Sequence, residues 1–133
     1  MMDQNPPLTV RIKANNGMYL SLRKTDNKLL PNQSERSNGT WFELVELGNG
    51  NLAFKASTGK YLSIKGPPPW TITADGDQPT GDQTFMLNTL GKNKVQIKTA
   101  NGCYLQADKA ETPLSASPKP AEKAGAFTIE VNR

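Results

Sequence analysis

Apolar and polar residues alternate in three similar stretches of the chain. In the first, Val10, Ile12 and Ala14 alternate with Arg11 and Lys13, which is the period of a strand that buries one face. Each stretch then reaches a glycine, which predicts a tight turn, and a Tyr-Leu pair that begins a return strand. The stretches cover residues 10–21, 52–63 and 95–106, and their glycines stand 42 and 43 residues apart at Gly17, Gly59 and Gly102.

Two further marks repeat with the same period. Phenylalanines at Phe42, Phe85 and Phe127 each precede an apolar residue two positions on, and a weaker mark recurs at Leu30, Ile72 and Leu114. Each repeat therefore predicts four short strands, and such self-similarity decides the architecture. Twelve strands in three four-stranded repeats predict an all-β fold, the β-trefoil, with pseudo-threefold symmetry and a short barrel closed at one end by three hairpins.

The repeated segments resemble the fascin-like, or actin-crosslinking-like, branch of β-trefoils. The resemblance rests on the segments LAFKASTGKYLS and TWFELVEL and extends over all three repeats. The ricin-type lectin branch is a poorer match, because its Gln-x-Trp signature is absent. The resemblance implies a binding module for glycans, or for actin or another protein.

The repeats leave little of the chain outside one domain. With 133 residues, we predict a tail over residues 1–7 and one domain over 8–133, with repeats at about 8–50, 51–93 and 94–133. No apolar run reaches membrane length, so we expect no membrane insertion. No signal peptide is visible, which predicts a cytoplasmic protein as the chain is written, or a secreted one if a leader has been removed.

Charge adds a weak constraint on partners. The net charge is +4, and residues 43–87 carry three basic and five acidic groups. A mildly basic chain with an acidic middle third is not typical of a dedicated polyanion binder, and nucleic-acid binding would need clustered cations with exposed aromatics. We therefore expect no nucleic-acid partner.

The chain lacks most residues that catalysis commonly uses. It has no histidine and a single cysteine, Cys103, which removes the usual nucleophile–base pairs, histidine metal clusters and intrachain disulfides. Asp75, Asp77 and Asp82 form one acidic loop, but hydrolases place carboxylates across a cleft, and the spacing departs from a calcium loop. We expect no enzyme activity, no cofactor and no metal.

A lysine and a tyrosine recur in every repeat. The lysines Lys13, Lys55 and Lys98 alternate away from the buried positions, so they are either threefold ligand contacts or rim residues whose stems cover apolar neighbours. The tyrosines flank the turns, where ring packing would explain them: Tyr19, Tyr61 and Tyr104.

The two tryptophans break the repeat, which makes them candidates for function. Trp41 corresponds to Thr84 and Ala126, and it should face outward because Phe42 faces inward. Trp70 follows the stiff segment Gly66-Pro-Pro-Pro and has no aromatic counterpart. It could stack on a sugar or fold onto the barrel.

The leading hypothesis is a non-catalytic, lectin-like carbohydrate-binding module with a shallow site in the middle repeat. Trp70 would be the stacking platform, Asp75 and Asp77 would accept sugar hydroxyls, and Lys60 or Gln78 would assist, with Trp41 a further candidate. The partner would be a glycan or polysaccharide. Actin or another protein is the alternative partner, and a hydrolase inhibitor acting through residues 66–70 is a third hypothesis.

Overall fold

The computed structural model describes residues 8–119 and 125–131, so the predicted tail lies outside the described residues. Over these residues the chain forms twelve strands and two short 3-10 helices. The strands are β1 (Leu8–Ala14), β2 (Tyr19–Leu22), β3 (Leu29–Gln33), β4 (Phe42–Gly48), β5 (Asn51–Ala56), β6 (Tyr61–Lys65), β7 (Trp70–Gly76), β8 (Phe85–Gly91), β9 (Lys94–Thr99), β10 (Tyr104–Gln106), β11 (Ser115–Ser117) and β12 (Phe127–Val131). The 3-10 turns η1 (Arg36–Asn38) and η2 (Gly81–Gln83) precede β4 and β8.

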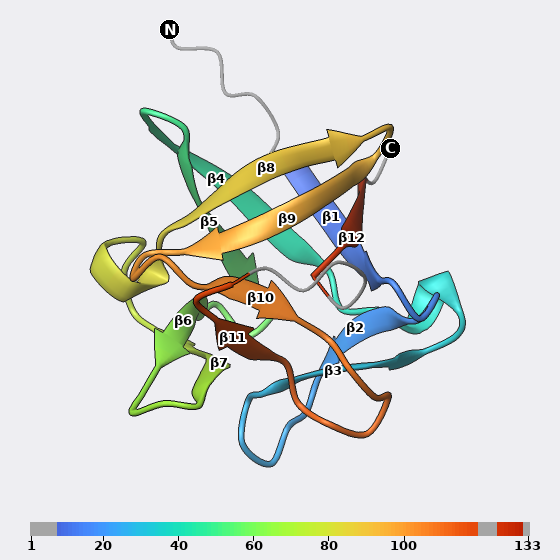
Figure 1. Ribbon diagram of the computed structural model, residues 1–133. Helices are drawn as coiled ribbons and strands as arrows, with labels where there is room; N and C mark the ends of the chain where they lie inside the picture. Colours follow the sequence, from blue (N-terminus) through green and yellow to red (C-terminus); the bar gives the residue numbers. More distant parts are fainter. Residues whose placement is uncertain (1–7, 120–124, 132–133) are drawn as a thin grey trace, which may run out of the picture.

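Six strands close into a ring of antiparallel pairs. β1 pairs with β4, β4 with β5, and β5 with β8. β8 then pairs with β9, β9 with β12, and β12 with β1. Figure 1 shows these six strands together in the upper half of the molecule. The predicted short barrel is therefore present.

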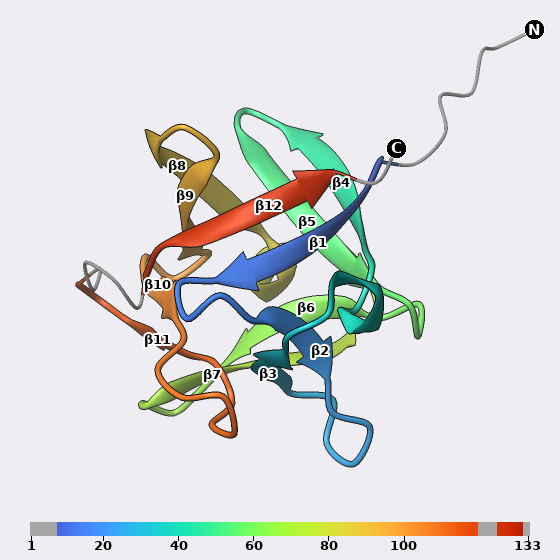
Figure 2. The same ribbon diagram turned by 90° about the vertical axis from the view of Figure 1, so that its right-hand side faces the viewer.

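The other six strands form three antiparallel pairs below the ring. β2 pairs with β3, β6 with β7, and β10 with β11. Figures 1 and 2 both show these pairs gathered at one end of the barrel. Hydrogen bonds such as Leu114 N to Leu29 O, 2.9 Å, and Ala74 N to Asn27 O, 2.8 Å, join one pair to the next.

The hairpin predicted in each repeat is present only at its turn. β1 and β2 pair at a single position, Lys13 with Tyr19, and the same single pairing joins Lys55 to Tyr61 and Lys98 to Tyr104. The two strands separate there because the first belongs to the barrel. The second belongs to the three strand pairs at the end of the barrel, which we call the cap. The sequence pattern predicts the turn but not this change of partner.

The repeated glycines make the three turns possible. Gly17, Gly59 and Gly102 have φ values of +85°, +90° and +86°, a region that residues with a Cβ rarely adopt. Each glycine N–H donates to the carbonyl three residues earlier, with N···O distances of 3.0, 2.9 and 3.1 Å. The turn conformation thus recurs in all three repeats.

The core fills the inside of the barrel with alternate strand residues. The repeated phenylalanines are at most 1% exposed, as is Phe54 from the middle repeat. Phe54 meets Phe42 and Phe85 edge-on, with ring centroids 6.4 and 5.6 Å apart, an arrangement that aromatic pairs favour. No helix in the described part of the chain is long and apolar enough to cross a membrane.

Candidate functional site

Trp70, the predicted stacking platform, packs against the protein. It is the first residue of β7 and is half-buried against the core. Its ring lies over Gly66, where an added Cβ would come within 2.1 Å of the indole. Trp70 also pairs with Ala116 of β11. The indole therefore packs between Gly66, at the start of the loop before β7, and the core of the protein.

Asp75 lies far along the same strand from Trp70. Five residues at about 3.3 Å each separate them by about 16 Å. Trp70 lies on the same face of β7 as the buried residues Ile72 and Ala74, whereas Asp75 is exposed on the other face. Asp75 forms an ion pair with Lys65 at 3.3 Å. The structure therefore does not bring Trp70 and Asp75 into one site, because a strand alternates its side chains between two faces.

Asp77, Lys60 and Gln78 do lie at one place, without the indole. The Lys60 ammonium donates a hydrogen bond to the Asp77 carboxylate, which lowers the pKa of Asp77 and raises that of Lys60. Gln78 is exposed next to this pair. The structure does not bring Trp70 together with these side chains, and Lys60 and Asp77 form a solvated ion pair.

Trp41 lines an open hollow in the barrel wall of about 350 Å³. We call this the Trp41 hollow; its lining includes Thr9, Trp41, Glu43, Lys55, Ser57 and Gly59. The indole is half-buried, as the outward or rim position expected from Phe42 requires. A half-buried aromatic beside a few converging polar groups is typical of a small-ligand site.

Strand register positions these side chains beside one another. Thr9 of β1 lies opposite Glu43 of β4, and Glu43 lies opposite Lys55 of β5. Ser57 and Gly59 belong to the turn after β5, so the hollow lies at the junction of the first and middle repeats. Neither Glu43 nor Lys55 forms an ion pair with another described residue, and the Lys55 ammonium lies 5.8 Å from the centroid of the Tyr61 ring.

Two arginines hold the indole. The guanidinium carbon of Arg11 lies 3.1 Å from the centroid of the Trp41 ring, and that of Arg36 lies 5.6 Å away. Arg11 is only 5% exposed and donates a hydrogen bond from Nε to the carbonyl of Gly39, 3.3 Å. Burial, and then the charge of Arg36, lower the pKa of Arg11. Cation–π contacts of this kind fix the orientation of an indole.

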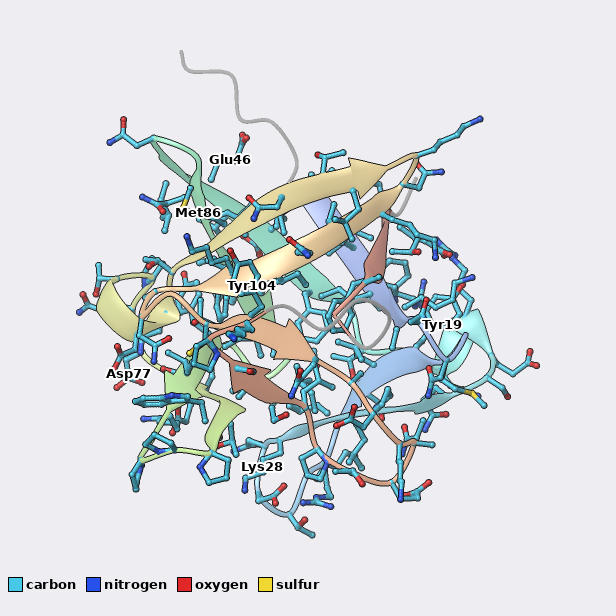
Figure 3. The ribbon with its side chains drawn as sticks, viewed as in Figure 1. Tyr19, Lys28, Glu46, Asp77, Met86 and Tyr104 are labelled. Atoms are coloured by element: carbon cyan, nitrogen blue, oxygen red, sulfur yellow. The ribbon has the colours of Figure 1, made fainter. Side chains whose placement is uncertain are left out.

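Glu130 of β12 contacts three neighbouring polar side chains. Arg36 Nε and the Tyr19 hydroxyl each donate to its carboxylate at 2.9 Å, and Lys13 Nζ lies 3.6 Å away. Burial alone would raise the pKa of Glu130, but the hydrogen bonds from Arg36 and Tyr19 outweigh it and the pKa is lowered. Figure 3 shows Tyr19 on the opposite side of the molecule from Asp77.

A second hollow occupies the equivalent place one repeat later. This Thr84 hollow measures about 260 Å³, and its lining includes Asn51, Thr84, Met86, Lys98, Ala100 and Gly102. Each of these six residues corresponds in the repeat to one of the six named for the Trp41 hollow. The fold itself therefore creates the hollow, and the side chains decide its chemistry: Thr84 and Met86 replace the indole and the carboxylate.

The repeated lysines and tyrosines contact each other in all three repeats. The lysine ammonium groups lie 5.4, 5.8 and 5.9 Å from the ring centroids of Tyr19, Tyr61 and Tyr104. Of the three tyrosines Tyr19 alone is buried; the backbone of Gly39 lies close to its Cβ, and its hydroxyl donates to Glu130. This recurrence agrees with the structural role considered for both residue types, while Lys55 and Lys98 also line the hollows.

Sequence reasoning found Trp41 but missed its neighbours. The alternation predicts Arg11 on the polar face of its strand, yet Arg11 is buried beneath the indole. A comparison of the repeats carries a signal, because Arg11 corresponds to Ala53 and Gln96, and Glu43 to Met86 and Thr128. Among the described residues no group of three acidic, cysteine or histidine side chains is placed to hold a metal ion.

Several solved structures share this fold at low sequence identity. The designed threefold symmetric protein ThreeFoil matches with a TM-score of 0.77 and 15% identity, covering 92% of this chain and 97% of that chain. A GlcNAcα1-4Gal-releasing endo-β-galactosidase from Clostridium perfringens matches with a TM-score of 0.77 and 14% identity, covering 95% of this chain but only 33% of the enzyme. A salivary protein of the cysteine and tryptophan-rich family from Culex quiquefasciatus matches with a TM-score of 0.72 and 13% identity, covering 98% and 97%.

Sequence comparison identifies the family. No curated protein sequence matches the chain significantly. The family model of the fascin domain matches residues 1–87, which is more than half of the chain and includes the first repeat and most of the second. The fold, the two segments that suggested the resemblance and this match agree, and the chain belongs to the fascin domain family as a fascin-like β-trefoil.

Proposed function

We propose that the protein is a non-catalytic carbohydrate-binding module whose site is the Trp41 hollow. The observation that supports this most is the half-buried indole in an open hollow of about 350 Å³, beside side chains that can donate to and accept from sugar hydroxyls. This site lies at the junction of the first and middle repeats, apart from Trp70 and the aspartates of the middle repeat.

The residues of the hollow take different roles in this proposal. The indole of Trp41 stacks on the apolar face of a pyranose ring, and the cation–π contact with Arg11 keeps it in place. The Glu43 carboxylate accepts hydrogen bonds from sugar hydroxyls, and Lys55 donates. The hydroxyls of Thr9 and Ser57 can do either. Few converging polar groups around one aromatic give orientation without burying the whole ligand.

The arrangement of the carboxylates supports the proposal of binding without catalysis. Glycoside hydrolysis uses two carboxyl groups flanking the scissile bond. Among the described residues that line the hollow, Glu43 is the only acid, and Glu130 is engaged by Arg36 and Tyr19. The endo-β-galactosidase that shares the fold acts on a glycan, and the chain matches one third of that enzyme. A glycan is therefore a suitable first class of ligand to test.

A glycan array with three proteins tests the proposal. We expect the wild type to bind at least one class of glycan and Trp41→Thr to lose that binding. Threonine occupies the equivalent position at residue 84, so the fold tolerates it. Trp70→Phe is the matched control and should bind as the wild type does. Absence of any glycan bound by the wild type, or equal binding by Trp41→Thr, would contradict the proposal.

Actin or another protein is the second candidate partner, because the fascin domain model matches the chain. One domain offers no obvious pair of separated filament sites, so the expected activity is binding rather than crosslinking. Cosedimentation with actin filaments tests it: binding should weaken as salt rises if lysine and arginine contacts carry it. A protein that stays in the supernatant at low salt excludes this candidate.

We also propose that the three repeats are related by an approximate threefold axis. Support comes from the three equivalent Lys–Tyr pairings, the three glycine turns and the six-strand ring. Superposition of the repeats in an experimental structure tests this, since repeats with different strand pairings would contradict it.

A further inference from the structure

The surroundings of Trp41 hold more positive than negative charge. Arg11 and Arg36 lie against the indole, Lys55 lines the hollow, and Lys13 lies beside the ring of Tyr19. Among the described residues, two carboxylates contact or accompany these cations: Glu43 lines the hollow with Lys55, and Glu130 pairs with Arg36 and Lys13. Glu130 forms ion pairs with both Arg36 and Lys13, whereas Arg11 and Lys55 form none with a described residue.

Arg11 is the most deeply buried of these cations. It is 95% buried, and its one hydrogen bond to a described residue is to a carbonyl oxygen. No carboxylate of a described residue lies within ion-pair distance of it. A buried cation without a counter-ion destabilises a protein, and a negative group that a ligand brings into the neighbouring hollow would offset part of that cost.

The other repeats do not contain this charge. The position of Arg11 is Ala53 in the middle repeat and Gln96 in the third, and the position of Trp41 is Thr84 and Ala126. The barrel closes equally well with these small or neutral residues. The requirement for a buried arginine stacked on an indole therefore comes from something other than the fold.

We propose that the ligand of the Trp41 hollow is an acidic saccharide. Its carboxylate or sulfate binds to Lys55, while Arg11 holds the indole and adds positive potential on the far side of the ring. This inference rests on the proposed carbohydrate function and names its ligand class. Lys55 is the directly binding residue because it lines the hollow. Arg11 is a positioning residue, because it acts through the ring of Trp41.

Calorimetry with three oligosaccharides of equal length tests the inference: an oligogalacturonate, a sulfated galactan and a neutral galactan. We expect at least one acidic oligosaccharide to bind about fivefold or more tighter than the neutral one at low salt. The preference should shrink as the salt concentration rises. Comparison of the oligogalacturonate with the sulfated galactan shows whether the hollow prefers a carboxylate or a sulfate.

Two variants locate the preference. Lys55→Gln should bring acidic and neutral binding close together, whereas Lys98→Gln, which removes the equivalent lysine of the Thr84 hollow, should leave the preference unchanged. Equal binding of acidic and neutral sugars by the wild type overturns the inference but leaves carbohydrate binding intact. Binding of none of the three overturns both. If polyglutamate displaces the bound acidic sugar as well as the free acidic sugar does, the inference is overturned, because the site would then recognise charge alone.

Discussion

Trp41 and Trp70 are the two indoles of the chain, and they differ in what surrounds them. Trp70 covers Gly66 and packs against the core, so its departure from the repeat has a local structural reason. Trp41 is held by two arginines and lines a hollow. Both break the repeat in the sequence. Only the packing of each ring separates the structural indole from the candidate binding residue.

Phe85 tests the buried face of the barrel at the scale of one residue. It is 1% exposed and meets Phe54 edge-on, so Phe85→Ala should lower the free energy of unfolding by about 3–5 kcal/mol, as core phenylalanine truncations do. Met86, its neighbour in sequence, is 40% exposed, and Met86→Ala should change stability far less. Urea denaturation of both variants measures this, and equal effects would contradict the assignment of faces.

Glu130 should make stability depend on pH. Its pKa is lowered in the folded protein, where the hydrogen bonds from Arg36 and Tyr19 outweigh the effect of burial. A lowered folded pKa stabilises the protein above the pKa of the unfolded chain, about 4.3. That stabilisation is lost as the pH falls through the folded value. Urea denaturation between neutral and acidic pH should show a steeper loss for the wild type than for Glu130→Gln, and identical profiles would contradict this role.

At the scale of elements, the strands were predictable and their partners were not. Alternation and the repeated phenylalanines locate the strands, because period-2 burial is a local property of the chain. The separation of β1 from β2 after a single pair depends on the closed ring, which no short stretch encodes. The length of β7 likewise separates Trp70 from Asp75, although the two are near in sequence.

Gly66 should be required for the packing of the loop before β7. An added Cβ would lie 2.1 Å from the indole of Trp70, so Gly66→Ala must displace the ring from the core. We expect a lower melting temperature and a red-shifted Trp70 fluorescence, measured with Trp41→Phe as background so that one indole remains. Gly91→Ala is the control, since no heavy atom lies within 4 Å of an added Cβ there. An unchanged emission maximum would mean that the ring does not lie over Gly66.

At the scale of the whole molecule, the repeat predicted the barrel, the cap and the family, while the site required the structure. The hollow is assembled from β1, β4, β5 and the turn after β5, which come from two repeats. Thr9 and Ser57 have no distinctive pattern in the sequence, whereas Glu43 differs in charge from its counterparts Met86 and Thr128. The excess of positive charge around Trp41 is also invisible in the net charge of +4, because it depends on which strands are neighbours.

The equivalence of the two hollows predicts that binding can be added to the second. Thr84 and Met86 occupy the positions of Trp41 and Glu43, so the double variant Thr84→Trp/Met86→Glu should raise the number of sugar sites from one to two, with the new site weaker because Ala53 replaces Arg11. Calorimetry gives the stoichiometry. A stoichiometry of one, with the fold intact by circular dichroism, would show that the indole and the carboxylate are not what makes the Trp41 hollow a site.

The indole N–H signals of the two tryptophans test the central claim most directly. They can be assigned with Trp41→Phe and Trp70→Phe and followed by ¹H–¹⁵N spectra during titration with an oligosaccharide bound on the array. A ligand in the Trp41 hollow should shift the Trp41 signal together with the backbone signals of Ser57 and Gly59, and leave the Trp70 signal in place. A shift of the Trp70 signal with Trp41 unmoved would contradict the account.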